Sequence, residues 1–223
     1  MTTLPHPDPA LDACDRIAQV LEEDILFGRI APGERLVEDP LMSRFDATRH
    51  AVRQALAKLE RAGVAVREKN RGASVRRLER AEVERIYEVR ELLVRQAVLR
   101  IPVPAPPALL AALRAMHEDH AGRRRERRWR ELYEVNDRFH VTLLGGCGND
   151  VLVDMIRHTM ALSLPVRAGG SADPGHAERS EREHGLMLRL LEGSDRWALA
   201  QLCVDHLQPA KERYFDALAP HQR

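Results

Sequence analysis

Hydrophobic positions recur at helical spacing over most of the chain, with one short exception around residues 64–75. Residues 12–27 place Ile17, Leu21 and Ile25 on one face of a helix. Beyond the exception, the same spacing predicts six further helices, separated by breaks that contain proline or glycine. Their predicted ranges are 79–100, 107–121, 129–144, 150–164, 176–192 and 195–219. The pattern indicates a mostly α protein whose C-terminal part is an all-α six-helix bundle.

Residues 38–75 depart from this uniform pattern. They predict a short helix, a tight turn, a second helix and a two-stranded hairpin. Asp39 is expected to cap the first helix, with Pro40 at its first position, and Thr48 is expected to cap the second. Gly63 follows the second helix directly, where a left-handed C-terminal cap is expected. Helix, turn and helix followed by a hairpin are typical of a winged helix-turn-helix.

The hairpin has a basic tip, residues 69–72, between the β-forming segments 64–66 and 73–75. In this architecture the second helix enters the major groove and the wing lies beside it. The wing tip is expected to reach the minor groove, where a glycine allows close approach. The predicted DNA-binding residues are Thr48, Arg49, His50, Arg53, Arg71 and Gly72.

Charge is distributed unevenly along the chain. Residues 48–77 contain nine Lys or Arg and two Asp or Glu, whereas residues 1–47 contain four Lys or Arg and ten Asp or Glu. The net charge of the whole chain, +1, conceals this basic segment. Concentrated positive charge is what binding to DNA phosphates requires. The alternative is a helical domain whose arginines form a solvated face, and it leaves the basic hairpin unexplained.

Composition limits the other classes of protein. Hydrophobic residues make up 44% of the chain and charged residues 31%, as in a soluble globular protein. No apolar run approaches the roughly 20 residues that span a membrane. The N-terminus lacks the basic and apolar regions of a signal peptide. The three cysteines have no metal-site spacing, which suits a reducing cytoplasm. We expect a cytoplasmic protein without a membrane partner, in which residues 1–10, with three prolines, are a disordered leader.

Four polar side chains fall on otherwise apolar faces of the predicted bundle. Asn136 and His140 lie one turn apart on one helix, and His184 and His206 lie on two further helices. Burial of an imidazole without a partner is costly, and neutral imidazole is the commonest protein metal ligand. One buried histidine alone is more often a hydrogen-bonded core residue. The four together favour a divalent metal site inside the bundle.

Arg90 and the arginine-rich residues 123–130 can each be explained either by contacts within the protein or by contacts with a ligand or DNA. Arg90 lies at the centre of an apolar helix face, where a guanidinium requires a carboxylate or phosphate partner. It is interpreted either as part of an internal ion pair or as a contact for the carboxylate of an effector. Residues 123–130 contain six arginines. They are more readily explained as a solvated loop than as a contact for DNA phosphates.

Residues 30–56 closely resemble the DNA-binding domain of GntR-type bacterial transcription regulators, and Asn70, Arg71, Gly72 and Val75 fit the wing of that family. The all-helical remainder resembles the FCD effector domain of the FadR-like subfamily. Six helices rather than seven are similar to its VanR-type branch. The two parts of the resemblance together cover residues 11–217.

The resemblance has implications for the metal site. In metal-binding FadR-like regulators an Asp four residues before a His joins two later His, and the spacing of His140, His184 and His206 is similar. Asn136 stands where Asp is usual, so its amide oxygen can ligate without adding negative charge. The resemblance therefore implies weaker binding of Zn²⁺, Ni²⁺ or Mn²⁺, with a metal-free protein as the alternative.

Three other positions bear on the resemblance. The family similarly has an arginine where this chain has Arg90, which implies a grip on the effector carboxylate. Val94 stands where a Glu is usual, so the pocket differs from the usual one. Asp39 and Pro40 stand where relatives often have Arg-Glu, which implies an unusual operator preference.

These inferences predict a ligand-responsive transcription regulator, most simply a repressor, that binds an inverted-repeat operator as a homodimer. Residues 11–77 would form the DNA-binding domain, and residues 78–219 the domain for effector binding, metal binding and dimerisation. A small organic acid bound near the metal would shift the population towards a state that cannot bind DNA.

Two other classes of function are considered. A metalloenzyme with an accessory nucleic-acid domain is the main alternative, and it is disfavoured because the chain has no HExxH pair and no carboxylate on the histidine-bearing faces. An architectural DNA binder would leave the buried histidines and Arg90 unexplained. We therefore expect no enzymatic activity.

Overall fold

The computed structural model describes residues 12–68, 72–167 and 173–218. The predicted leader, residues 1–10, and the wing residue Arg71 lie outside these ranges. The described chain divides into two compact units. The first, here called the winged-helix unit, comprises the described residues of 1–79 and 161–169. The second, here called the helical unit, comprises those of 80–160 and 170–223.

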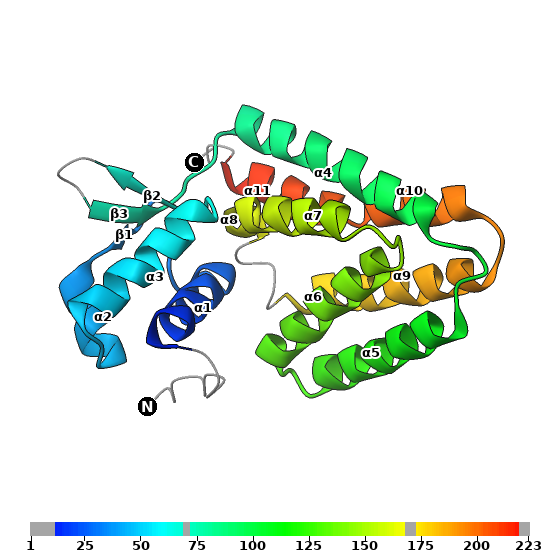
Figure 1. Cartoon of the computed structure of the whole chain (residues 1–223), viewed down its shortest axis with the longest axis horizontal. Coiled ribbons are helices and arrows are strands. Elements are labelled where there is room, and N and C mark those ends of the chain that lie inside the picture. Colours follow the sequence, from blue (N-terminus) through cyan, green and yellow to red (C-terminus); the bar gives the residue numbers. More distant parts are fainter. Residues whose placement is uncertain (1–11, 69–71, 168–172, 219–223) are drawn as a thin grey trace. The chain divides into compact units, whose positions relative to one another are not determined.

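The winged-helix unit combines helices with a small sheet (Figure 1). Helix α1 packs against α3, and α2 packs against α3. The described strands form an antiparallel sheet in the order β1-β3-β2, with Arg35 opposite Ser74 and Ala65 opposite Val75. The elements are α1 (Ala13–Leu26), β1 (Arg35–Leu36), α2 (Glu38–Phe45), α3 (Arg49–Arg61), β2 (Ala65–Glu68) and β3 (Gly72–Val75). Strand β1 is not among the predicted elements, because two residues are too short to show an alternating pattern.

Local signals position α3. The Thr48 hydroxyl accepts a hydrogen bond from the Ala51 backbone N–H at 3.3 Å, as predicted for its N-cap. Asp46 ends α2 in the left-handed conformation, with φ 46°. Gly63 has φ 74°, also as predicted, and a Cβ there would lie 2.3 Å from Leu162 Cδ2. Gly63 is therefore required both for its backbone conformation and for the close approach of Leu162.

The predicted cap at Asp39 is wrong. Helix α2 begins at Glu38, its N-cap residue is Val37, and no side chain caps it. The carboxylates of Glu38 and Asp39 bind arginines of α3 instead of the free N–H groups of α2. Pro40 consequently stands at the third helical position, where the backbone N–H has no intrahelical acceptor and proline loses no hydrogen bond.

A segment from much later in the chain completes the winged-helix unit. Residues 161–167 belong to this unit, and within them α8 (Leu164–Arg167) packs against α1. Ser163, Leu164, Pro165 and Val166 are all buried. The core of the unit therefore depends on residues that are remote in sequence from the helix-turn-helix.

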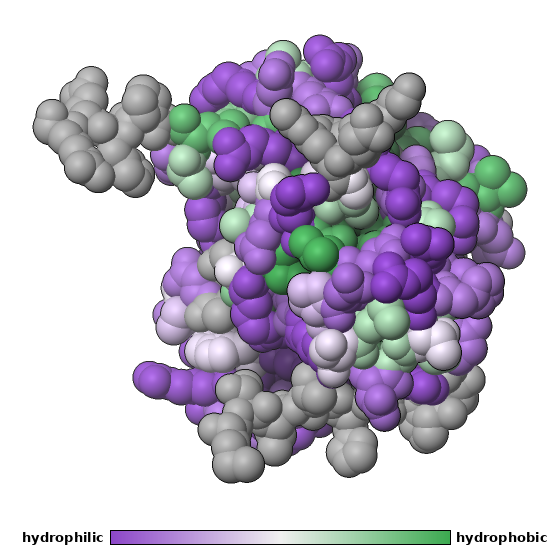
Figure 2. Space-filling model, turned by 90° about the vertical axis from the view of Figure 1, so that its left-hand side faces the viewer, coloured by the Kyte–Doolittle hydropathy of each residue, from purple (hydrophilic) through white to green (hydrophobic). Residues whose placement is uncertain are grey.

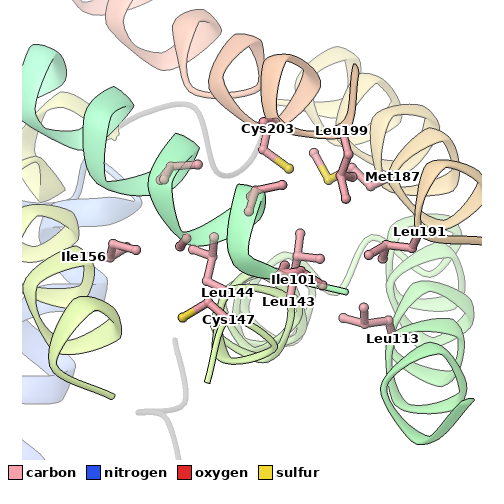
Figure 3. Packing of buried hydrophobic residues seen from close by; sticks show 14 of the residues in the cluster. Ile101, Leu113, Leu143, Leu144, Cys147, Ile156, Met187, Leu191, Leu199 and Cys203 are labelled. Atoms are coloured by element: carbon pink, nitrogen blue, oxygen red, sulfur yellow. The ribbon is translucent and has the colours of Figure 1, made fainter. Parts of the chain in front are cut away.

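The helical unit is all α (Figure 1). Its helices are α4 (Arg80–Arg100), α5 (Pro107–Arg125), α6 (Trp129–Gly145), α7 (Asp150–Leu162, to Met160 in this unit), α9 (Pro174–Glu192), α10 (Arg196–Asp205) and α11 (Gln208–Leu218). Helix α5 packs against α6 and α9, and α4 packs against α6, α10 and α11. Figure 3 shows the apolar core between them, to which α5, α6, α7, α9 and α10 all contribute.

Three predicted helix ranges need correction. The predicted helix 150–164 ends at Leu162, before Pro165, and the predicted helix 195–219 is interrupted between Asp205 and Gln208, before Pro209. Proline removes a backbone donor and its ring clashes with the carbonyl four residues earlier, which explains both breaks. Helix α5 instead runs past its predicted end to Arg125, and an ion pair between Arg123 and Asp119 lies along this extension.

Hydrophilic residues dominate the side of the chain that carries α1, α2 and α3, as Figure 2 shows. Within the part of the chain that the structure describes, none of the helices combines the length and apolar character needed to cross a bilayer.

Candidate metal centre and DNA-binding surface

Three histidines from distant parts of the sequence meet inside the helical unit. His140 lies on α6, His184 on α9, and His206 is the residue that ends α10. The Nε2 atom of His140 lies 3.2 Å from Nε2 of His184 and 3.1 Å from Nε2 of His206. His184 is fully buried, and the other two are partly buried. The structure thus brings together the three histidines predicted as ligands.

The two Nε2 separations at His140 fit a shared metal ion, and the possible ligand atoms of the three histidines all lie within 4.8 Å of one another. With metal–nitrogen bonds of about 2.1 Å, adjacent ligand nitrogens lie about 3.0 Å apart in octahedral and about 3.4 Å apart in tetrahedral geometry. The two Nε2 separations at His140 fall within that interval. In a neutral imidazole one ring nitrogen carries a hydrogen and the other a lone pair. Nε2 of His140 therefore cannot form equally good hydrogen bonds to the nitrogens of both His184 and His206. Three convergent imidazole nitrogens therefore make a coherent donor set for a divalent cation.

Glu183 orients one of the three rings. Its carboxylate binds Nδ1 of His206, and it also accepts a hydrogen bond from Arg179 at 2.7 Å. In a neutral ring this contact assigns the N–H to Nδ1 and leaves the lone pair on Nε2, which faces His140. Burial alone would raise the pKa of the Glu183 carboxyl, but the hydrogen bonds from His206 and Arg179 lower it to about 2. A carboxylate behind a ligating histidine is a usual part of metal sites.

Asn136, the fourth predicted ligand, reaches this cluster through a serine. The Ser180 hydroxyl donates to Asn136 Oδ1 at 3.1 Å and lies 3.4 Å from His184 Nε2. Ser180 is buried, whereas Asn136 is partly buried. The amide oxygen of Asn136 is therefore engaged at the edge of the cluster.

Aromatic and imidazole rings surround His184. Phe139 stacks on it with ring centroids 4.1 Å apart, and His120 lies edge-on at 5.1 Å and His117 at 6.5 Å. Burial lowers the pKa of His184 well below its usual value, and the neighbouring imidazoles act in the same direction. Burial also lowers the pKa of His120, to about 4. His184 and His120 are therefore neutral near pH 7, the state in which imidazole binds metals.

Sequence reasoning missed Glu183, Ser180, His117 and His120. His117 and His120 follow Leu113 at helical spacing, so the apolar face of α5 carried a signal. Glu183 lies next to His184 in the sequence and gave no comparable signal, because it approaches His206 only in the fold.

The predicted effector residue Arg90 is buried on α4, with its Cζ atom 5.0 Å from the centre of the Tyr87 ring. The Tyr87 ring is fully buried, and its hydroxyl has no hydrogen-bond partner among the described residues. The Lys211 ammonium lies 5.4 Å from the same ring. The interior face of α4 therefore holds an arginine and a tyrosyl hydroxyl on a helix that packs against α6 and α10.

On the winged-helix unit, the predicted DNA-binding residues of α3 are exposed. Arg49, His50 and Arg53 all lie on the outer face of the helix. Gln54 Nε2 and His50 Nε2 are 2.9 Å apart. Gly72 begins β3 with φ 79°, and a Cβ there would contact nothing within 4 Å. Arg71 lies outside the described residues, so the wing tip itself stays a prediction.

The arginines of residues 123–130 have internal partners. Arg123 pairs with Asp119, Arg124 binds Glu181 on α9, and Arg128 pairs with Glu131 at 2.9 Å. Arg130 binds Glu134 at 3.2 Å, one helical turn away. The charge of this run is largely balanced within the helical unit. The predicted solvated loop is limited to residues 126–128, because residues 123–125 end α5 and Arg130 lies in α6.

Comparisons with known proteins identify a family for each of the two units. The model of the bacterial regulatory proteins of the gntR family matches residues 13–75, and the model of the FCD domain matches residues 85–209. An uncharacterized HTH-type transcriptional regulator, YdhC of Bacillus subtilis (strain 168), is 26% identical over 191 residues, which are 83% of this chain and 84% of YdhC.

One further relative and one solved structure are similar to this chain. The HTH-type transcriptional repressor RspR of Escherichia coli (strain K12) is 24% identical over 213 residues, 95% of this chain and 93% of RspR. The solved structure of E. coli McbR/YncC shares the fold, with a TM-score of 0.75 and 17% identity over 94% of this chain and all of that one (100%). The match to the FCD domain covers more than half of the chain, and the GntR match covers the helix-turn-helix and wing. The chain therefore belongs to the FCD family of GntR-type DNA-binding transcription regulators.

Proposed function

We propose that this regulator is a metal-dependent repressor whose operator binding is weakened by a small organic acid. The observation that supports this most directly is the convergence of three imidazole nitrogens within the helical unit, with 3.2 Å and 3.1 Å separations at His140. Similarity to RspR, which is named a repressor, supports the sign of regulation.

The donor set indicates which metals are the best candidates. His140, His184 and His206 supply nitrogen only, and Asn136 would add a neutral oxygen. Imidazole suits Zn²⁺ and Ni²⁺, whereas Mn²⁺ prefers carboxylate oxygen. Among the predicted metals, we therefore favour Zn²⁺ or Ni²⁺ over Mn²⁺.

Arg90 is the proposed contact for the effector. Its side chain is buried on α4, which packs against the helices that carry His140 and His206. A bound metal would supply a Lewis-acidic position for one carboxylate oxygen. The guanidinium of Arg90 can donate two parallel hydrogen bonds to a carboxylate, and the Tyr87 hydroxyl is a further donor. Hydroxy acids, sugar acids, dicarboxylates and amino acids carry the required group.

The DNA-bound form is proposed to be a homodimer on an inverted repeat. Each recognition helix α3 would enter a major groove, with Arg49 and Arg53 near base edges or phosphates and Thr48 and His50 beside them. Arg71 and Gly72 of the wing would approach the adjacent minor groove. Because its partner is the bacterial chromosome, the regulator would act in the cytoplasm.

Metal analysis combined with DNA binding tests this proposal. Purified full-length protein should contain or take up one divalent ion per chain. In a fluorescence-anisotropy titration with DNA from the promoter regions beside its own gene, one organic acid from a panel should weaken binding only when metal is present. Binding that no acid changes in either state would overturn the proposal. Hydrolysis of small esters by the metal-loaded protein would favour the metalloenzyme instead.

A further inference from the structure

The recognition helix carries an ion-pair arrangement that treats its two arginines differently. Arg49 uses both terminal nitrogens internally: Nη2 donates to Asp39 Oδ1 at 2.7 Å and Nη1 to Glu38 Oε2 at 3.3 Å. Arg53 is held from the other side of its guanidinium, because Nε donates to both oxygens of Glu38 at 3.0 Å. The two side chains are thus held in defined and different orientations on the surface that faces DNA.

The available donors follow from these contacts. Arg53 binds Glu38 through Nε, so the fork formed by Nη1 and Nη2 is available to the O6 and N7 acceptors of a guanine. In Arg49 the same fork is directed towards Glu38 and Asp39. Arg53 is therefore suited to direct base reading, and Arg49 to positioning the acidic residue beside it.

The two carboxylates differ in exposure. The Glu38 side chain is 21% exposed, and the hydrogen bond from Arg53 is the main cause that lowers its pKa. The Asp39 side chain is 73% exposed, so its carboxylate is presented to whatever approaches α3. Near DNA, an exposed carboxylate is repelled by phosphates but can accept a hydrogen bond from the N4 amino group of cytosine.

From this geometry we propose that Asp39 determines operator specificity. Its carboxylate, held by Arg49, weakens binding to DNA that is contacted only through its phosphates. The same carboxylate favours a G·C pair whose cytosine amino group faces it. The charges of Arg49 and Arg53 are balanced by Glu38 and Asp39, so this face of α3 attracts phosphates less strongly than two unpaired arginines would. The inference rests on the proposed contact of Arg49 and Arg53 with operator DNA.

The test begins by selecting bound duplexes from a pool of 30-base-pair DNA with a random core, using the full-length wild-type protein and the Asp39→Asn variant. The wild type should enrich a half-site with a G·C pair at a position where the variant accepts any base. Affinity of the variant for a fixed duplex without the enriched half-site should rise, and the ratio of specific to non-specific affinity should fall about tenfold.

Two controls separate this effect from a change in net charge. Asp46→Asn removes the same charge at the other end of α2, from a left-handed position that Asn also tolerates, and it should leave the half-site and the affinity ratio unchanged. Asp39→Glu keeps the carboxylate and should retain weak non-specific binding. An equal effect of Asp46→Asn, or an unchanged half-site and ratio in Asp39→Asn, would overturn the role of Asp39. Failure of the wild type to enrich any half-site would instead contradict the proposed operator contacts.

Discussion

The two units use polar side chains in opposite ways. In the winged-helix unit Arg49 and Arg53, which are proposed to contact DNA, are exposed on α3 and form ion pairs with residues of α2. In the helical unit the proposed metal ligands are buried or partly buried, and His184 and His206 lie 44 and 66 residues after His140 in the sequence. A surface for DNA can be built from local structure, because phosphates and base edges come from outside. A site for a metal requires that distant helices are already packed together.

The largest effect is expected at the buried centre. His140→Ala removes the imidazole whose Nε2 lies within 3.2 Å of Nε2 of His184 and of Nε2 of His206. Loss of a residue that only hydrogen-bonds a metal ligand typically lowers metal affinity about 10- to 100-fold. Loss of one of the three ligands themselves should lower it by more than about 100-fold. Isothermal titration with Zn²⁺ and Ni²⁺ measures this. His158→Ala, at an exposed position on α7, is the matched control and should bind metal as the wild type does.

The corresponding change on the surface is Arg53→Ala. A bidentate base contact contributes about 1–3 kcal/mol of discrimination, so specific operator affinity should fall about 5- to 150-fold while metal binding is unchanged. Combining it with Arg49→Ala should abolish specific retention in a gel-shift assay. Arg61→Ala, at the far end of the same helix, is the control. If Arg53→Ala and the double variant with Arg49→Ala both retained the operator as the wild type does, the assignment of α3 as the recognition helix would fail.

Glu183 tests whether the buried site depends on contacts behind the ligands. Glu183→Gln keeps the size of the side chain but removes the carboxylate that holds His206 Nδ1. Metal affinity should fall about 10- to 100-fold with little change in the far-ultraviolet circular dichroism spectrum. Glu178→Gln on the same helix breaks only an exposed pair with Arg182 and should have no effect on metal binding. Equal affinities in both variants would show that Glu183 has no part in the site.

The smallest effect is expected for a purely local contact. Thr48→Ala removes the hydroxyl that caps α3, which should lower the free energy of unfolding by about 1 kcal/mol. Chemical denaturation measures the change, and Thr48→Ser should restore most of the stability. A loss of metal binding in Thr48→Ala would contradict the independence of the local cap from the metal site in the helical unit.

This separation also explains what could be predicted from the sequence. Thr48 and Gly63 were recognised because a cap and a left-handed glycine are signals contained in a few adjacent residues. His140, His184 and His206 were recognised by their helical phase, and the structure brings them together. The contact between Glu183 and His206 could not be predicted, because no periodicity relates α9 to the end of α10.

Other errors had identifiable local causes. The helix breaks before Pro165 and Pro209 follow from the missing N–H of proline, which is a signal contained in the sequence. Asp39 has the residue type of a helix cap, but its side chain is directed to Arg49, a competing partner ten positions away. In that case tertiary contact overrode a local preference.

The position of α8 bears on how such regulators can exchange parts during evolution or in the laboratory. The winged-helix unit is not one continuous stretch, because residues 161–167 return to it and pack against α1. A fragment that ends at residue 79 lacks this segment and leaves apolar surface of α1 open to water. A functional chimera that receives the winged-helix unit must therefore also receive residues 161–167, or residues that replace their packing.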